Sequence, residues 1–327
     1  EPQEGEGTTQ DRGLLGFATA PDFAASGIFY LYLTNLAGDC EVRRYRTLAG
    51  NRDRAKLQRP HVHKSGGGGE KVSRLRWPYP GSCWWKFDFH THTPASHDTP
   101  WYMQNLSLSP QDWLLRYMAV EIDCVAVTDH NSGAWIDTLR AAYEGMKAQA
   151  EQGQPPTGFR ALTLFPGVEI SVQGGVHVLA LFGPEATTSD IDTLLGRVGY
   201  AGTKGNSDAE TSQSLQHVLQ AVLDSGAIPI PAHVDSAKGL LRVNPGTREC
   251  ALSAHMVKQA LAVDGVLAVE WCDLANPWPQ AVESQSNRFA RVLGSDCHTF
   301  RNSNQPGGSY TWVKMANPTL EGLRLAL

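Results

Sequence analysis

The sequence predicts an α/β fold in which strands and helices alternate, most simply a barrel of the (β/α) kind. Two observations lead to this prediction. From Trp84 onward, short apolar runs alternate with longer runs whose apolar residues recur at helical spacing. In addition, polar side chains with metal-binding chemistry follow the apolar runs, as they do at the mouth of such a barrel. A doubly wound open sheet is the alternative arrangement of the same elements.

The predicted strands are short, nearly continuous apolar runs, which are typical of buried and mostly parallel sheets. They cover residues 85–89, 124–128, 162–167, 176–182, 227–231, 266–271 and 291–294, with 310–315 as an eighth. Only residues 171–175 separate Ile170 from Val176, which predicts a hairpin at this point instead of a helix. Apolar stripes at helical spacing predict helices over 136–146, 215–223 and 256–261.

Residues 1–80 differ from the rest, so we predict an N-terminal β or irregular extension over 1–80 and a main domain over 81–327. Residues 27–34 are predicted to form a strand, with residues 42–45 as its partner. The stretch 47–80, basic and then glycine-rich, is interpreted as a flexible linker, and His61 and His63 within it are not expected to bind metal.

Residues 13–46 also resemble the edge of one blade of the soluble quinone-dependent sugar dehydrogenases. A propeller needs about four to eight blades, so no dehydrogenase activity follows from this resemblance.

Composition describes an ordinary globular protein with no general affinity for polyanions. The 327 residues are 41% hydrophobic and 19% charged, and the formal net charge is -5. This balance gives no general attraction to nucleic acid or anionic membranes, and no run of about 18 apolar residues predicts a membrane span. The six cysteines form no Cys-x-x-Cys pair and the amino terminus is acidic and polar, so we expect reduced thiols, no signal peptide and a cytoplasmic location.

The chemically active side chains fall at strand ends. His90 and His92 end the first strand and point to the same side of it, because side chains two apart on a strand share a face. Further members of the pattern are His97, Asp98, Asp129, His130, Glu169, His177, His233, Asp296 and His298. Any single histidine here has an ordinary structural interpretation. Together, buried at one barrel mouth, these groups require compensating cations, and imidazole is a common metal ligand.

These residues, in this order, resemble the PHP (polymerase and histidinol phosphatase) superfamily. The motifs are His90-Thr91-His92 with Ser96-His97-Asp98, Thr128-Asp129-His130, Gly167-Val168-Glu169, His177, Ala232-His233 and Ser295-Asp296-Cys297-His298. The resemblance covers residues 85–300, and residues 84–96 are similar to the TrlF-like proteins in particular. It implies a distorted (β/α)7 TIM-like barrel that holds two or three divalent metal ions, zinc first and manganese or iron as alternatives.

Carried over position by position, the resemblance implies the metal ligands His90, His92, His130, Glu169, His177, His233, Asp296 and His298. One more ligand is expected after the first motif, and we assign it to Asp98, with His97 as the alternative.

The implied activity is that of a PHP-type metal-dependent phosphoesterase, in which metal-bound water supplies hydroxide near neutral pH. The catalytic candidates are Glu169, which would bridge two metals, Asp296, which would be a ligand or accept the proton of the water, and Asp129, which would orient a ligand imidazole. Lys204 and Lys238 are candidates for substrate binding, because a phosphate needs cationic donors.

The expected partner is a phosphorylated small molecule or nucleotide, with no membrane. Two alternatives differ in class: a nuclease acting on nucleic-acid ends, and a non-catalytic, metal-stabilised regulatory module. TrlF-like proteins usually join this domain to an ATPase, which this sequence does not contain, so a separate ATPase is an expected partner for the second alternative.

Overall fold

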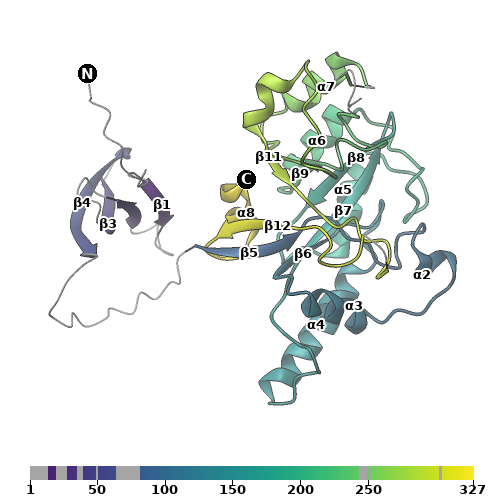
Figure 1. Ribbon diagram of the computed structural model, residues 1–327, viewed down its shortest axis with the longest axis horizontal. Helices are drawn as coiled ribbons and strands as arrows, with labels where there is room; N and C mark the ends of the chain where they lie inside the picture. Colours follow the sequence, from purple (N-terminus) through teal and green to yellow (C-terminus); the bar gives the residue numbers. More distant parts are fainter. Residues whose placement is uncertain are drawn as a thin grey trace. The chain divides into compact units, whose positions relative to one another are not determined.

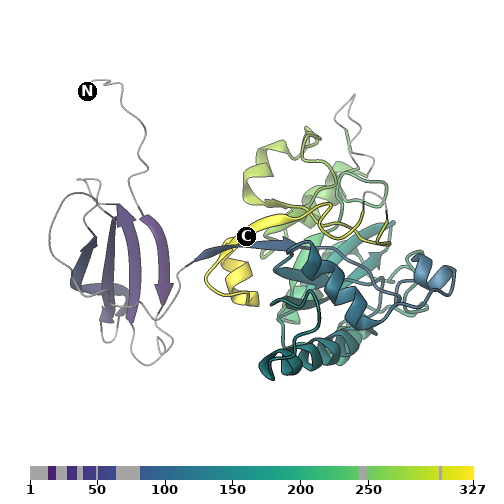
Figure 2. The same ribbon diagram turned by 60° about the horizontal axis from the view of Figure 1, so that its bottom comes forward.

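The computed structural model describes residues 14–19, 28–34, 40–48, 51–63, 82–242, 249–250, 252–301 and 304–327. The chain divides into two units, Glu1–Trp77 and Pro78–Leu327, which are described separately. Figures 1 and 2 show the described segments of both units from two directions.

The first unit contains an antiparallel sheet with the strand order β1-β2-β3-β4. The strands are β1 (Leu14–Thr19), β2 (Ile28–Thr34), β3 (Cys40–Leu48) and β4 (Asn51–His63). The predicted pairing of 27–34 with 42–45 is present, and Phe29 lies opposite Tyr45 with the two rings stacked at 5.3 Å.

The interpretation of residues 47–80 as a linker is wrong for its first part. His61 and His63 lie in β4, opposite Val42 and Cys40 of β3. The prediction failed because β4 is largely polar, so hydrophobic periodicity carries no signal there, whereas pairing with β3 supplies the backbone hydrogen bonds. The glycines at 66–69 lie outside the described residues.

The second unit is a mixed α/β structure built on a curled sheet with the strand order β12-β5-β6-β7-β8-β9 and a separate pair, β10-β11. Its strands are β5 (Cys83–Asp88), β6 (Cys124–Val127), β7 (Thr163–Val172), β8 (Val176–Leu181), β9 (Ile228–Pro231), β10 (Ala268–Glu270), β11 (Ala290–Val292) and β12 (Thr311–Met315). Strands β5, β6 and β7 are parallel neighbours, and β7 and β8 form the predicted hairpin.

The sheet curls so that its distant ends approach each other. The backbone N–H of Val234, after β9, donates to the carbonyl of Glu270 in β10. On the other side, Asp296 N–H donates to the carbonyl of His90, and His92 N–H donates to the carbonyl of Cys297. The segments that follow β5, β9 and β11 are therefore brought together at one end of the sheet.

Two apolar layers hold this curl in place, because successive residues of a strand point to opposite faces. Val125 and Val127 of β6 point outward into a core shared with the helices. Cys124 and Ala126 of the same strand point inward, where Phe87 and Phe165 pack at 4.9 Å between ring centroids. Strands β6 to β9 are therefore buried on both faces, which explains their nearly continuous apolar sequences.

The helices cover the outer layer; in Figure 1, α3 and α4 lie below the strands and α6 and α7 above them. Their bounds are α2 (Pro100–Met103), α3 (Pro110–Ala119), α4 (Ile136–Glu151), α5 (Thr188–Arg197), α6 (Leu215–Asp224), α7 (Ala254–Leu261), the 3₁₀ helix η1 (Glu283–Arg288) and α8 (Leu320–Ala326). Helices α4, α6 and α7 were predicted. Within the described residues, no helix has both the length and the apolar character needed to cross a bilayer.

Candidate metal centre

Six imidazole rings converge where the carboxyl ends of the strands meet. They belong to His90, His92, His130, His177, His233 and His298. Neighbouring rings of this group lie between 4.0 and 5.7 Å apart, centroid to centroid. The first five residues are buried, and His298 is partly exposed. Loops that are far apart in the sequence therefore contribute to a single cluster, which we call the His cluster.

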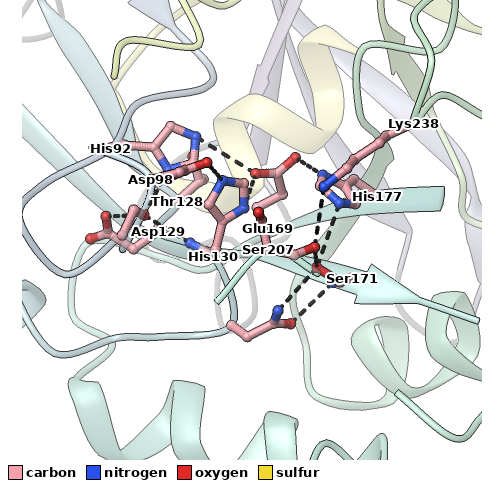
Figure 3. A network of polar contacts seen from close by, with 12 residues as sticks. His92, Asp98, Thr128, Asp129, His130, Glu169, Ser171, His177, Ser207 and Lys238 are labelled. Atoms are coloured by element: carbon pink, nitrogen blue, oxygen red, sulfur yellow. Dashed lines mark hydrogen bonds and ion pairs between the residues drawn. The ribbon is translucent and has the colours of Figure 1, made fainter. Parts of the chain in front are cut away.

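Glu169 lies at the centre of the His cluster. Its Oε1 is 2.6 Å from His177 Nδ1 and 2.9 Å from His233 Nε2. Its Oε2 is 2.7 Å from His130 Nδ1 and 3.2 Å from His90 Nε2. Figure 3 shows this carboxylate between His130 and His177. One buried carboxylate thus connects the two halves of the cluster.

Two further carboxylates lie at the open side of the His cluster. Asp296 Oδ1 is 3.2 Å from His92 Nε2 and 3.4 Å from His298 Nδ1. Asp98 Oδ2 is 2.9 Å from His130 Nε2 and 3.2 Å from His298 Nε2. The side chains of Asp296 and Asp98 are 35% and 39% exposed, so they form the face that solvent or a substrate reaches first.

Strand register explains how His177 reaches Glu169. In the β7–β8 hairpin, Glu169 lies opposite Leu179, and Ser171 lies opposite His177. Glu169 and His177 are therefore diagonal neighbours on one face of the sheet, within reach of each other's side chains. The antiparallel strand β8 contributes its first residues to the same end at which the parallel strands contribute their last.

Two cluster residues have a left-handed backbone. The φ angle is 28° at His233 and 48° at Asp296, in a region that non-glycine residues adopt rarely. His233 lies two residues after the end of β9 and Asp296 four residues after the end of β11, and both side chains contact the cluster. Such conformations persist where the surroundings hold them, as the hydrogen bonds from His233 N–H to Glu270 and from Asp296 N–H to His90 do here.

Glu270 determines which nitrogen of His90 faces the cluster. Its Oε2 is 2.9 Å from His90 Nδ1, and a carboxylate only accepts hydrogen bonds. We therefore place the proton of a neutral His90 on Nδ1, an assignment from the hydrogen-bond network. His90 Nε2 then presents a lone pair to the cluster, 3.1 Å from Nε2 of His92.

The Ser96 hydroxyl, which is hydrogen-bonded to Asp129, determines which nitrogen of His92 faces the cluster. Ser96 Oγ donates its one proton to Asp129 Oδ1 at 2.7 Å and lies 2.9 Å from His92 Nδ1. The hydroxyl oxygen must then accept from His92, so the proton of His92 is on Nδ1 and Nε2 faces the cluster. Thr93 also donates to Asp129, from both its backbone N–H and its hydroxyl. Asp129 therefore reaches the His cluster through Ser96.

Hydrogen-bond partners also indicate where the protons of His298 and His177 lie. His298 Nδ1 lies 2.9 Å from the backbone carbonyl of Asp296, so it carries the proton and leaves Nε2 free. His177 directs Nδ1 at Glu169 Oε1 at 2.6 Å, and because a carboxylate only accepts, Nδ1 carries the proton until a metal ion replaces it. On the outer side, Ser171 Oγ lies 3.5 Å from His177 Nε2. Outer hydrogen bonds of this kind are the usual support of metal-binding imidazoles.

The electrostatics of the His cluster favour ionised carboxylates. Burial opposes the ionisation of Glu169, but the imidazoles of His177 and His130 outweigh it and hold the pKa of Glu169 well below its usual range. Desolvation also opposes the ionisation of the partly exposed Asp296, but His90 and His92 outweigh it and hold the pKa of Asp296 below its ordinary value. These carboxylates are negative at neutral pH and in turn attract positive charge into the cluster.

The pKa values of His92 and His130 shift in opposite directions. Burial beside His298 and His130 lowers the pKa of His92 to about 3, so His92 is neutral and available as a ligand. Burial also disfavours a charged His130, but Glu169 and Asp98 outweigh it and raise the pKa of His130 to about 10. In the metal-free protein a proton therefore occupies a position that a cation would otherwise fill.

Unpaired buried atoms fit the requirements of a metal ion. His130 Nδ1 and Glu169 Oε2 are only 2.7 Å apart, yet neither has a hydrogen-bond partner of acceptable geometry. Both atoms can serve as metal ligands once His130 has lost its proton, and leaving polar atoms unpaired in a protein interior is costly. Nitrogen and carboxylate oxygen donors together suit zinc and similar transition metals.

The structure also places the predicted residues that lie outside the cluster. His97 stacks on Tyr102 at 3.8 Å between ring centroids, whereas Asp98 faces the cluster. Lys204 forms an ion pair with Asp192 at 2.6 Å. Lys238 lies closer: its carbonyl accepts from His177 N–H, and its ammonium contacts the Ser207 carbonyl at 3.3 Å (Figure 3).

Sequence reasoning missed Glu270. This carboxylate is buried and accepts from both His90 Nδ1 and His233 N–H, each at 2.9 Å. It lies against Gly294, where a Cβ would come within 2.6 Å of Glu270 Oε1. The signal was present, because Glu270 is the one charged residue of the apolar run 266–271 and occupies its carboxyl end, like the other site residues.

Comparison with known proteins gives similarities of structure only. No family model and no curated protein matches the chain. The chain is similar to a two-domain protein from Bacteroides vulgatus that contains a predicted PHP-like metal-dependent phosphoesterase, at 17% identity and a TM-score of 0.43, over 80% of this chain and 67% of that one. It is similar to a candidate metal-dependent phosphoesterase from Bifidobacterium adolescentis, at 19% identity and a TM-score of 0.40, over 74% and 95%.

A third similar structure is an amidohydrolase from Chromobacterium violaceum with bound sulfate and no metal, at 16% identity and a TM-score of 0.38, over 68% and 89%. All three TM-scores lie below 0.5, so the function below is argued from the geometry of the His cluster. The first of these structures is named for the same PHP-like class that the sequence motifs resemble, and none of the three addresses the TrlF-like proteins.

Proposed function

We propose that this protein is a PHP-type metal-dependent phosphoesterase whose active site is the His cluster. The observation that carries the proposal is the orientation of the rings: hydrogen bonds from Nδ1 on the outer side of His90, His92 and His298 turn the Nε2 atom of each inward. A structural histidine has no need of such an arrangement, whereas a metal-binding histidine requires it.

Three overlapping groups of side chains have the spacing to hold an ion, and their ligand atoms lie within 4.8 Å of one another in each group. They are His90, His92 and Asp296; His92, His130 and His298; and His130, Glu169 and His177. Asp98 and His233 complete the predicted set of ligands by their contacts with His130 and Glu169. We propose two or three divalent ions, with zinc as the first choice. We also propose that β5 to β11 correspond to the seven strands of a distorted (β/α)7 barrel.

Divalent ions at these residues would activate a water molecule and neutralise charge on a phosphoryl group. The chain's own contribution is to position charged oxygens and ligand imidazoles. Asp296 and Asp98 present partly exposed, negatively charged oxygens at the open side, and Asp296 is the carboxylate that we propose to accept a proton from the attacking water. Glu169 is fully buried and holds the two halves of the site at a fixed separation. Asp129 acts as a positioning residue for His92 through Ser96.

The substrate class that we propose is a phosphorylated small molecule or nucleotide, handled in the cytoplasm. Lys238 is the better of the two candidate phosphate-binding cations, because its backbone carbonyl already accepts from His177 N–H and its side chain is 41% exposed. Its ion pair with Asp208 is exposed and therefore contributes little, so the ammonium can exchange Asp208 for a phosphate. Lys204 is paired with Asp192, and its role in binding stays a prediction.

The test measures metal content and turnover on the same samples. Elemental analysis of the purified chain is followed by assays with p-nitrophenyl phosphate in the presence of Zn²⁺ or Mn²⁺. The double variant His90→Ala/His92→Ala should lose both bound metal and activity. His217→Ala is the matched control, because His217 is an exposed histidine on α6. Full turnover in the double variant, or a wild-type protein that binds no divalent metal, would refute the proposal.

A further inference from the structure

A second exposed surface lies on the ribbon formed by β5 and β12. Trp84 and Lys86 of β5 lie opposite Lys314 and Trp312 of β12, so all four side chains share one face and alternate in a checkerboard. Tyr310 borders the same face, with its ring edge-on to Trp312 at 5.9 Å and beneath the ammonium of Lys86 at 4.2 Å. We call these five residues the Trp–Lys face.

The exposure of this face is unusual for the chain. Trp84 is 60% and Trp312 53% exposed, whereas Trp113, Trp271 and Trp278 are buried. The opposite side of β12 is apolar and packs into the inner core. Large aromatic side chains that are exposed together often mark a surface that binds a partner. Nothing in the proposed chemistry of the His cluster uses them.

Geometry and charge indicate the class of partner. Diagonal neighbours on an antiparallel pair lie about 7–8 Å apart, so the two indoles can each receive one of two successive bases. Lys86 and Lys314 alternate with the indoles. Lys314 Nζ lies 5.9 Å from the Trp84 ring centre, and Lys86 Nζ donates one hydrogen bond to the Val120 carbonyl at 2.8 Å, which leaves its other two N–H groups for a backbone phosphate. The nearby carboxylate of Asp123 is neutralised by Arg160 at 2.7 Å. Aromatic rings interleaved with cations on a sheet surface are the usual means of binding unpaired bases.

Two other partners fit this face less well. An acidic peptide would pair with the lysines but would leave the indoles without flat groups to stack on. A second copy of the chain, docked through the same face, would gather four lysines in one interface, and none of the five residues of the Trp–Lys face is a carboxylate that could compensate them.

We propose that the Trp–Lys face is a binding site for single-stranded nucleic acid, separate from the His cluster. Trp84 lies near the start of β5 and His90 lies two residues after its end, so at about 3.3 Å per residue the two are about 20 Å apart. A bound oligonucleotide would therefore leave the metal site open to a small phosphoester. This inference does not depend on the activity proposed above.

The test is fluorescence anisotropy of the full chain with a labelled oligothymidylate of about ten nucleotides, a length within the usual site size. Each of Trp84→Ala and Trp312→Ala should weaken binding by about 5- to 150-fold, the range found for loss of one stacked base. Trp312→Phe should restore most of the affinity that Trp312→Ala loses. With two ammonium contacts, the logarithm of the binding constant should fall with the logarithm of salt concentration with a slope of about -1.4, and Lys314→Gln should halve that slope.

Leu274→Ala is the control, because Leu274 is an exposed apolar residue outside the Trp–Lys face. Its affinity should equal that of the wild type, and saturating oligonucleotide should leave hydrolysis of p-nitrophenyl phosphate unchanged. The inference is overturned if the wild type does not bind at low salt, or if the Trp84→Ala/Trp312→Ala variant binds equally well. Sedimentation that shows a wild-type dimer, dissociated by the same double variant, would assign the face to a second copy and would equally overturn it.

Discussion

Replacing Glu270 should weaken metal binding without disturbing the fold. Its carboxylate accepts hydrogen bonds from His90 Nδ1 and from His233 N–H, both at 2.9 Å. A hydrogen bond to a charged group contributes about 1.5–3 kcal/mol, which corresponds to about 10- to 150-fold in a binding constant. Glu270→Gln keeps one accepting oxygen but loses the charge, so we expect metal affinity to fall about tenfold. Glu270→Ala removes both acceptors and should cost about 100-fold.

The assay is competition for Zn²⁺ between the protein and a chromophoric chelator, with urea denaturation of the metal-free protein measured in parallel. Glu151→Gln is the matched control, since Glu151 is an exposed residue at the end of α4. If Glu270→Gln binds metal as tightly as the wild type, the carboxylate does not set the orientation of His90. If the loss of affinity is accompanied by an equal loss of unfolding free energy in the metal-free protein, the role of Glu270 is structural instead.

Three further predictions follow from the same geometry. Removal of metal by a chelator should lower the melting temperature, because an ion present at 100 times its Kd stabilises the folded state by about 2.7 kcal/mol; an unchanged melting curve would contradict this. Metal uptake at neutral pH should release protons, because the raised pKa of His130, about 10, keeps that ring protonated below this pH in the metal-free protein, and affinity should therefore rise with pH. Calorimetry in two buffers of different ionisation enthalpy measures this release, and a heat independent of the buffer would argue against it. Phe165→Ala should reduce the free energy of unfolding by about 3–5 kcal/mol in urea titrations, because Phe165 is fully buried inside the curl; Leu325→Ala, at a strongly exposed position, should change it by less than about 0.5 kcal/mol.

Strands β6 to β9 could be predicted from the sequence because they are buried on both faces. Val125 and Ala126 pack into different layers, so the run containing them is continuously apolar and easily recognised. Helices α3 and α5 were not predicted, although each begins with a readable cap: Ser109 accepts from Asp112 N–H, and Thr187 and Asp190 form a capping box. The polar strand β4 carried no such signal, because its order comes from pairing with β3.

The candidate site was predictable to the extent that its residues directly follow strands. The ligand that follows the first motif was not predictable, because neither periodicity nor composition distinguishes His97 from Asp98. Tertiary contacts decide between them. His97 N–H donates to the carbonyl of Gly205 and its ring stacks on Tyr102, which leaves Asp98 to face His130. Such a choice depends on a loop more than a hundred residues away, which no local pattern in the sequence reports.

The groups behind the imidazoles, more than the imidazoles themselves, distinguish this cluster from a hydrogen-bonded set of buried histidines. In a hydrogen-bonded set, each ring would donate to its neighbour and accept from another, and the rings would satisfy each other. Here Glu270 fixes the proton of a neutral His90 on its Nδ1, and Ser96 fixes the proton of His92 on the Nδ1 of that ring. The two Nε2 atoms then face each other at 3.1 Å. Burial opposes a charged His90, but Glu270 and Glu169 outweigh it and raise the pKa of His90, so the space between these nitrogens holds positive charge, either a proton or a metal ion. The outer layer of acceptors therefore makes the inner layer of nitrogens a binding site for positive charge.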